Sequence, residues 1–218
     1  KTALMTLSET TPAEYNGTFA EVSAQAKRSG GFVMTGHTTK AIAAQGTKTD
    51  VAVTLERTVA KLAVQASTTA EFSERYSGKV RINSAVLSKA ASRSNLIAQQ
   101  TPNTGPMTFT HTQAADELSG KFRNLFYVPE NGELAEGSRL LLTLGATYDR
   151  DGNFSTTDDQ AEVTYPVELS GDGAGRFLRN GYYRVQALID GLTGSELSVS
   201  ISVADWEAPV TQSVNLGQ

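Results

Sequence analysis

The sequence predicts a mainly β protein whose strands form an antiparallel sandwich. From residue 49 onwards, apolar residues alternate with Ser, Thr and charged residues at period two, which is typical of strands with one solvated face. Turn-forming Gly, Asp and Asn residues separate these segments. Of the 218 residues, 39% are hydrophobic, which is enough for a folded core, and no apolar run approaches the roughly 20 residues of a membrane-spanning helix.

The clearest strand pattern covers Val51–Val64. The odd positions 51, 53, 55 and 59 are apolar, and even positions such as Thr54 are polar. The phase then reverses, because Leu62 continues the apolar series at even positions. Such a reversal requires a bulge or a change of sheet, and we expect one of them near Arg57–Lys61.

The remaining strands are predicted by similar alternation between turn residues. They cover Lys79–Leu87, Leu125–Val128, Arg139–Tyr148, Ala161–Leu169, Gly181–Ile189, Glu196–Ala204 and Val210–Leu216. Seven or more strands in this arrangement indicate an antiparallel sandwich.

The first 48 residues have a different character. Pro12-Ala13-Glu14 is an acidic start suited to a short helix, and Ala20–Lys27 follows it. Phe32-Val33-Met34 predicts a short strand, and Gly36–Lys48 is polar and rich in Gly and Thr. We therefore place a domain boundary between residues 48 and 49, with one domain at 1–48 and the other at 49–218.

The composition limits the available chemistry. The chain has no cysteine, which excludes thiolate catalysis, cysteine-bound metals and disulfides, and its two histidines argue against a His-rich metal centre. The net charge of −4, without a dense Lys/Arg cluster, argues against nucleic acid as a partner. His37 and His111 lie in Thr-rich stretches, which is typical of loop histidines. We expect no cofactor, no metal and no enzymatic activity.

Two loops contain residues that other proteins use to bind ions or phosphates. Asp149-Arg150-Asp151-Gly152-Asn153 has the carboxylates of a calcium loop, but Gln160 stands where an EF-hand has Glu. Asp-Gly between two strands favours a hairpin turn over calcium binding. Gly171-Asp172-Gly173-Ala174-Gly175 is similar to a phosphate loop, but a strand rather than a helix follows it, which favours a flexible surface loop.

The end of the chain holds the other candidates. Trp206, the only tryptophan, either closes the core, as large aromatics favour, or forms an exposed platform for sugars. The last predicted strand has Val210, Val214 and Leu216 on one face and polar residues on the other. A chain-terminal strand of this kind pairs within its own sheet or adds to the open edge of a neighbouring molecule.

Several segments, taken in order, resemble a known family. They are Gly31–Thr35, Leu55–Leu62, Phe126–Asn131 (Phe-Tyr-Val-Pro-Glu-Asn), Tyr165-Pro166-Val167, Leu178–Val185 (with Arg-Asn-Gly-Tyr-Tyr) and Val199–Trp206 (ending Ala-Asp-Trp). They are similar to segments of the fimbrillins of Bacteroidales bacteria, which are the subunits of type V pili. The resemblance covers nearly the whole chain.

The resemblance implies transthyretin-like Greek-key sandwich domains and a structural, non-enzymatic role. It implies export as a lipoprotein precursor to the outer membrane and cell surface, and donor-strand exchange with other fimbrial subunits, in support of adhesion and biofilm formation. Under this interpretation, Val210, Val214 and Leu216 belong to the donated or groove-capping strand, and Trp206 anchors the core beside it.

The sequence departs from the family pattern at its start. Only 30 residues precede Gly31, where family members have most of a first domain. Residues 1–48 are therefore interpreted as the remnant of an N-terminal fimbrillin domain in a truncated, proteolysed or unusually short subunit. We expect the lipid-bearing cysteine upstream of Lys1.

A second hypothesis is a glycan-binding surface adhesin or pilus-tip protein that recognises glycans or proteins of host or bacterial surfaces. It predicts an exposed aromatic side chain near a groove, for which Tyr182, Tyr183 and Trp206 are the candidates.

Overall fold

The computed structural model describes residues 8–10, 32, 34–91, 93–95, 107–117, 124–192, 197–204 and 210–215. Four sequence candidates lie outside these ranges: the predicted helix start at Pro12–Glu14, the segment Ala20–Lys27, Trp206 and Leu216. Among the described residues, no helix is both long enough and apolar enough to cross a membrane.

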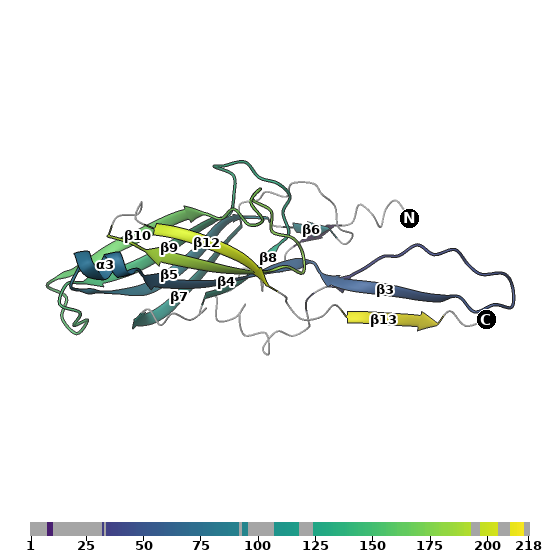
Figure 1. Ribbon diagram of the computed structural model, residues 1–218, viewed down its shortest axis with the longest axis horizontal. Helices are drawn as coiled ribbons and strands as arrows, with labels where there is room; N and C mark the ends of the chain where they lie inside the picture. Colours follow the sequence, from purple (N-terminus) through teal and green to yellow (C-terminus); the bar gives the residue numbers. More distant parts are fainter. Residues whose placement is uncertain are drawn as a thin grey trace.

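Two four-stranded sheets make up the body of the molecule, which we call the sandwich (Figure 1). One has the order β10-β9-β5-β7, with β5 at Lys79–Ala90, β7 at Met107–Glu117, β9 at Leu141–Asp149 and β10 at Gln160–Glu168. The other has the order β12-β11-β4-β8, with β4 at Val59–Thr68, β8 at Asn124–Pro129, β11 at Tyr182–Ile189 and β12 at Leu197–Ala204. A mainly β sandwich is thus confirmed, although β11 and β4 pair in parallel.

The core lies between these sheets and follows from the alternation in the sequence. In β11, buried residues at 183, 185, 187 and 189 alternate with more exposed ones. The largest fully buried side chains come from both sheets and from the segments that join them: Tyr127, Tyr165, Phe72, Phe126, Phe177, Leu62, Leu87, Leu140, Leu142, Leu144, Leu169 and Ile189. Burying one such side chain stabilises the fold by roughly 1.5–3 kcal/mol, so hydrophobic packing can hold this cysteine-free chain together.

Three smaller elements lie outside the two sheets of the sandwich. The helix α3 covers Ala70–Arg75 and buries the Phe72 ring. Thr69 is its N-cap, because the Thr69 hydroxyl accepts a hydrogen bond from the N–H of Phe72. The strand β1 at Ser8–Thr10 pairs with β6 at Arg93–Asn95. The sequence pattern predicted none of these three elements, nor β7.

A separate sheet extends beyond the sandwich. It consists of β2 (Met34–Thr35), β3 (Asp50–Arg57) and β13 (Val210–Asn215), in the order β13-β3-β2, and we call it the arm. Figure 1 shows β3 and β13 side by side beyond the end of the sandwich, with β3 running toward it and β13 running away from it. At about 3.3 Å per residue, the eight residues of β3 span about 25 Å.

The change of sheet that the sequence predicted is confirmed. β3 ends at Arg57 in the arm and β4 begins at Val59 in the sandwich, so Thr58 alone lies between the two sheets. The strands predicted after residue 78 are all present, with ends shifted by a few residues. The domain boundary after residue 48 stays a prediction.

Candidate functional site

The arm is the feature that sets this chain apart from a closed sandwich. β13 pairs antiparallel with β3, which places Val210 opposite Leu55 and Val214 opposite Val51. In β3 the apolar residues Val51, Val53 and Leu55 are half-buried, while the residues between them are exposed. The last strand therefore pairs outside the sandwich, and β3 offers one apolar face.

The edges of the arm differ. Within the described part of the chain, β13 pairs with β3 alone, so its second edge carries no strand. On the other side of β3, β2 pairs only with Glu56 and Arg57. Gly36 then lies against Thr54, so closely that a Cβ atom at Gly36 would be 2.0 Å from the Thr54 carbonyl oxygen. The β13 edge is thus the more accessible one, and an open strand edge is a template for further pairing.

A buried ion pair lies at the base of the arm. Arg179 donates from Nε to Oε2 of Glu130 over 2.9 Å and from Nη2 to Oε1, and both residues are 8% exposed. Nη1 of Arg179 also donates to the hydroxyl of Thr35, in β2, over 2.9 Å. One guanidinium therefore joins an arm strand to the segment that follows β8.

Asn180 holds the base of the arm from the next position. Its Oδ1 accepts from Nη1 of Arg57 over 3.0 Å and from the Arg57 backbone N–H over 3.5 Å. Its own N–H donates to the carbonyl of Val59 over 2.9 Å. The backbone of Asn180 is left-handed, with φ at 57°, a conformation that Asn tolerates better than most residues.

An apolar surface lies on the β12 edge of the sandwich. β12 is the terminal strand of its sheet, and Val199, Ile201 and Val203 lie opposite the buried residues of β11. Val199 and Ile201 are half-buried, whereas Val203 is 65% exposed. The inner face of the sandwich is therefore open to solvent at this end of β12.

The candidate aromatic residues for glycan binding lie in different environments. Tyr183 is 2% exposed, packs against Phe177 and accepts the Leu178 N–H at its hydroxyl, so its ring offers no face to a ligand. Burial raises the pKa of Tyr183 above its usual value. Tyr182 is half-buried, with Nζ of Lys61 4.5 Å and Cζ of Arg184 5.4 Å from its ring centroid. Two cationic side chains therefore already contact the Tyr182 ring, which would have to stack against a sugar.

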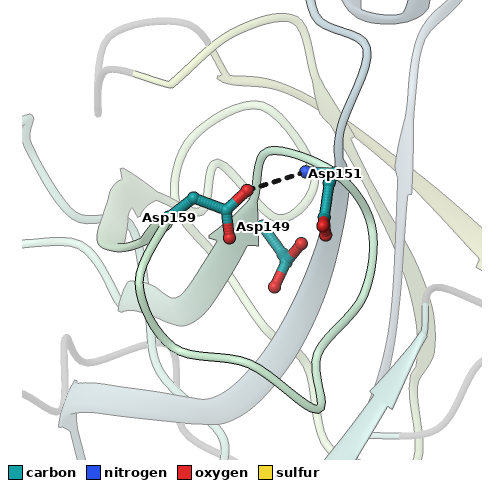
Figure 2. Close-up of side chains that lie close together, drawn as sticks. All are labelled: Asp149, Asp151 and Asp159. Carbon is teal, nitrogen blue, oxygen red and sulfur yellow. Dashed lines mark hydrogen bonds between the residues drawn. The ribbon is translucent and has the colours of Figure 1, made fainter.

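The β9–β10 loop brings three carboxylates together (Figure 2). Asp149 is fully buried, Asp151 is exposed and Asp159 lies between these extremes, and one oxygen of each lies within 4.8 Å of the others. Oδ2 of Asp159 accepts the N–H of Asp151, while Gln160 and the N–H of Asn153 donate to Asp149. Among the described residues, this group is the one that could hold a cation. The loop joins two antiparallel strands, as the hairpin interpretation predicted, and the expectation that no metal binds here stays a prediction.

The pKa values of two of these carboxyls move in opposite directions. Burial opposes ionisation of Asp149, but the hydrogen bonds from Gln160, Asp151 and the N–H groups of Asn153 and Gly152 outweigh it and lower the pKa. The N–H of Asn153 favours ionised Asp151, but the neighbouring carboxyls and burial outweigh it and raise the pKa. The loop therefore stabilises one charge and resists the second.

The other sequence candidates are spread over the molecule. The Gly171–Gly175 loop packs against the segment that follows β8, because Asn131 donates to the Gly175 carbonyl and Leu134 donates to that of Ala174. His37 is exposed after β2, and His111 lies in β7, where it pairs with Ala85. The interpretation as a loop histidine is therefore wrong for His111, which lies in a strand. Val210 and Val214 lie in the arm, and sequence reasoning did not identify Glu130, Arg179 or Asn180 as its support.

The chain is similar to solved structures of Bacteroides and Porphyromonas proteins. A candidate cell adhesion protein of Bacteroides eggerthii is 15% identical, with a TM-score of 0.60 over 94% of this chain and 71% of its own. The tip fimbrial protein Mfa3 of Porphyromonas gingivalis, with C-terminal truncation, is 15% identical, with a TM-score of 0.42 over 70% of this chain and 52% of its own. A fimbrilin (FimA) of the same species is 17% identical, with a TM-score of 0.44 over 70% and 59%.

No family model and no curated protein matches the sequence. The chain shares the fold of the Bacteroides eggerthii protein over 94% of its own length, in agreement with the sandwich that the sequence predicted.

Proposed function

We propose that this chain is a structural subunit of a type V fimbria that assembles by donor-strand exchange at the bacterial cell surface and supports adhesion and biofilm formation. The observation that carries the proposal is the position of β13, which pairs with β3 in the arm instead of joining either sheet of the sandwich. The fold shared with a candidate cell adhesion protein agrees with a structural rather than an enzymatic role.

The physical basis of the proposal is strand addition. An open strand edge carries unpaired N–H and C=O groups, and a strand from another molecule satisfies them while its apolar side chains fill the adjoining surface. β13 has an open edge in the described chain, and Val210 and Val214 recur along it at a spacing of four residues. These two residues and Leu216 are our candidates for the donated strand.

The β12 edge is the described surface that best fits a donated strand. Among the described strands none pairs with its outer edge, and the side chain of Val203 is exposed on the inner face. Because the donor arm and this acceptor edge are different surfaces of one molecule, the contact is heterologous. Contacts of this kind grow into open filaments when the rotation between copies does not close a ring.

The remaining parts of the proposal concern export and processing. We propose that the partners are other fimbrial subunits, that the protein reaches the surface as a lipoprotein precursor, and that residues 1–48 are the remnant of an N-terminal domain. Electron microscopy of the bacterial surface with and without the gene tests the location.

Deleting residues 209–218 tests the assembly role. We expect the shortened chain to form no filaments by negative-stain electron microscopy while its thermal unfolding stays cooperative. Since deletion also uncovers β3, a paired substitution is the sharper test. Val210→Asp with Val214→Asp should abolish filaments, and Thr211→Asp with Ser213→Asp on the other face should weaken them less. Unchanged filaments in the deleted chain would refute the proposal.

A further inference from the structure

The junction between arm and sandwich is unusually short. Thr58, at 1% exposure, alone separates β3 from β4, yet the strands belong to different sheets. A single residue retains two rotatable backbone dihedrals, so the backbone connection alone does not fix a direction for the arm. Contacts of side chains with the two sides of the junction must supply that direction.

Asn180 contacts both sides of the junction. Its Oδ1 accepts two hydrogen bonds from Arg57, at the end of β3, and its N–H donates to Val59, at the start of β4. Next to it, the backbone N–H of Lys61 donates to the carbonyl of Gly181. A rotation of the arm about Thr58 would separate the Arg57 donors from this oxygen.

Arg179 holds the second arm strand. Its guanidinium binds Glu130 through two nitrogens and Thr35 through the third. A bidentate guanidinium–carboxylate pair has a defined plane, and burial protects it from water and salt. The hydroxyl of Thr35 therefore accepts a hydrogen bond from the Arg179 guanidinium, whose orientation is already determined by its pairing with Glu130.

We propose that Arg179 and Asn180 are positioning residues that clamp the arm in one direction relative to the sandwich. Through the arm, they also set the geometry with which one subunit meets the next. The second statement rests on the proposed function, whereas the first concerns a single molecule and stands without it.

Spin labelling tests the clamp directly, because the chain has no cysteine of its own. Ala52→Cys and Gln186→Cys introduce labelling sites at exposed positions of β3 and β11. Double electron–electron resonance then measures the distribution of distances between arm and sandwich, in a sample diluted with unlabelled protein so that each measured pair lies within one molecule.

Two substitutions release the arm without leaving a buried charge unpaired. Asn180→Gly removes the Oδ1 acceptor and keeps the left-handed backbone, which Gly adopts readily. Thr35→Val removes the hydroxyl and keeps the shape of the side chain, while Arg179 retains Glu130. Asn153→Gly is the matched control, since its loop lies at the opposite end of the molecule from the arm (Figure 1).

We expect one narrow distance distribution in the parent protein and in the Asn153→Gly control. In the Thr35→Val/Asn180→Gly variant the distribution should be at least twofold broader, with each single variant between these limits. An equally narrow distribution in a folded double variant overturns the clamp. If the double variant does not fold, Asn180→Gly alone decides by the same criterion.

Filaments give the second readout. If the parent protein forms filaments, those of the double variant should lose their regular axial repeat. If the parent protein forms none, the proposed function fails, and the spin-label distances still decide whether the clamp exists.

Discussion

The buried Glu130–Arg179 pair should carry a large share of the stability at the base of the arm. Arg179→Met keeps most of the side-chain volume but leaves the carboxylate of Glu130, which is 8% exposed, without its guanidinium. Breaking a buried ion pair by removing one partner costs about 3–5 kcal/mol. For a chain of this length, each kcal/mol shifts the melting temperature by about 2–4 °C, so we expect a decrease of about 6–20 °C.

A second substitution separates the cost of leaving one buried charge unpaired from the net contribution of the ion pair to stability. In Arg179→Met/Glu130→Met no charge remains buried, and apolar replacements of buried pairs are often close to neutral. We expect the double variant to recover most of the lost stability. Arg176→Met is the control, because Arg176 pairs with Asp172 over 2.6 Å at a side chain that is 40% exposed, and such surface pairs contribute about 1 kcal/mol or less.

Thermal unfolding followed by circular dichroism measures all of these variants under the same conditions. The reasoning fails if Arg179→Met unfolds at the temperature of Arg176→Met, because the buried pair would then contribute no more than a surface pair. It also fails if the double variant is less stable than Arg179→Met, because the unpaired carboxylate of Glu130 would then not be the source of the lost stability.

Three further predictions concern other surfaces. Val203→Lys should suppress filament formation with little loss of stability, because Val203 is 65% exposed. The control Ser202→Lys, on the opposite face of β12, should assemble normally. Sedimentation of both variants checks this prediction. The N–H of Gly137 and the ammonium of Lys89 lower the pKa of Glu168, so its carboxylate adds stability above its ordinary pKa that is lost as the pH falls through the lowered value. Glu168→Gln should therefore cost up to about 1 kcal/mol at pH 7 and nothing in acid below both pKa values, as urea unfolding at the two pH values would show. Gly171→Ala should lower the melting temperature more than Gly46→Ala. Both backbones are left-handed, but only the Cβ at Gly171 would meet backbone atoms, 2.0 Å from the Arg176 carbonyl oxygen. Equal losses in the two variants would contradict this.

The sequence pattern predicted the sandwich because the alternation that indicates a strand lies within the residues of that strand. The phase reversal after Val59 is local, and it marked the change of sheet within a few residues of Thr58. Elements with weak local patterns were not predicted. In β7 the alternation fades after Phe109, and the strand is an edge of its sheet, where fewer apolar residues are needed. The helix α3 has only six residues and one buried ring.

The clamp could not be predicted in the same way, because its contacts join distant parts of the chain. Arg179 is 49 residues from Glu130 and 144 from Thr35, and Asn180 is 123 residues from Arg57. No periodicity spans such separations. Arg179 and Asn180 did lie in a segment that resembled the fimbrillins, yet the resemblance gave them no role. The carboxylate cluster was predicted in part, since Asp149 and Asp151 are close in sequence while Asp159 joins them through the loop.

The arm depends on two different kinds of contact. A two-stranded ladder is at best marginally stable in water. Within the described residues, most of β3 pairs only with β13, since β2 adds two register pairs at its base. The apolar residues of β3 are half-buried at most, so the arm gains less from the hydrophobic effect than any central strand of the sandwich. The clamp can fix where the arm points, because it acts at Thr35 and Arg57, but it buries nothing near Val51, where β3 begins. Under the proposed function, direction is therefore set within the subunit before assembly. Under the same proposal, the burial that stabilises the arm comes afterwards, from the next molecule.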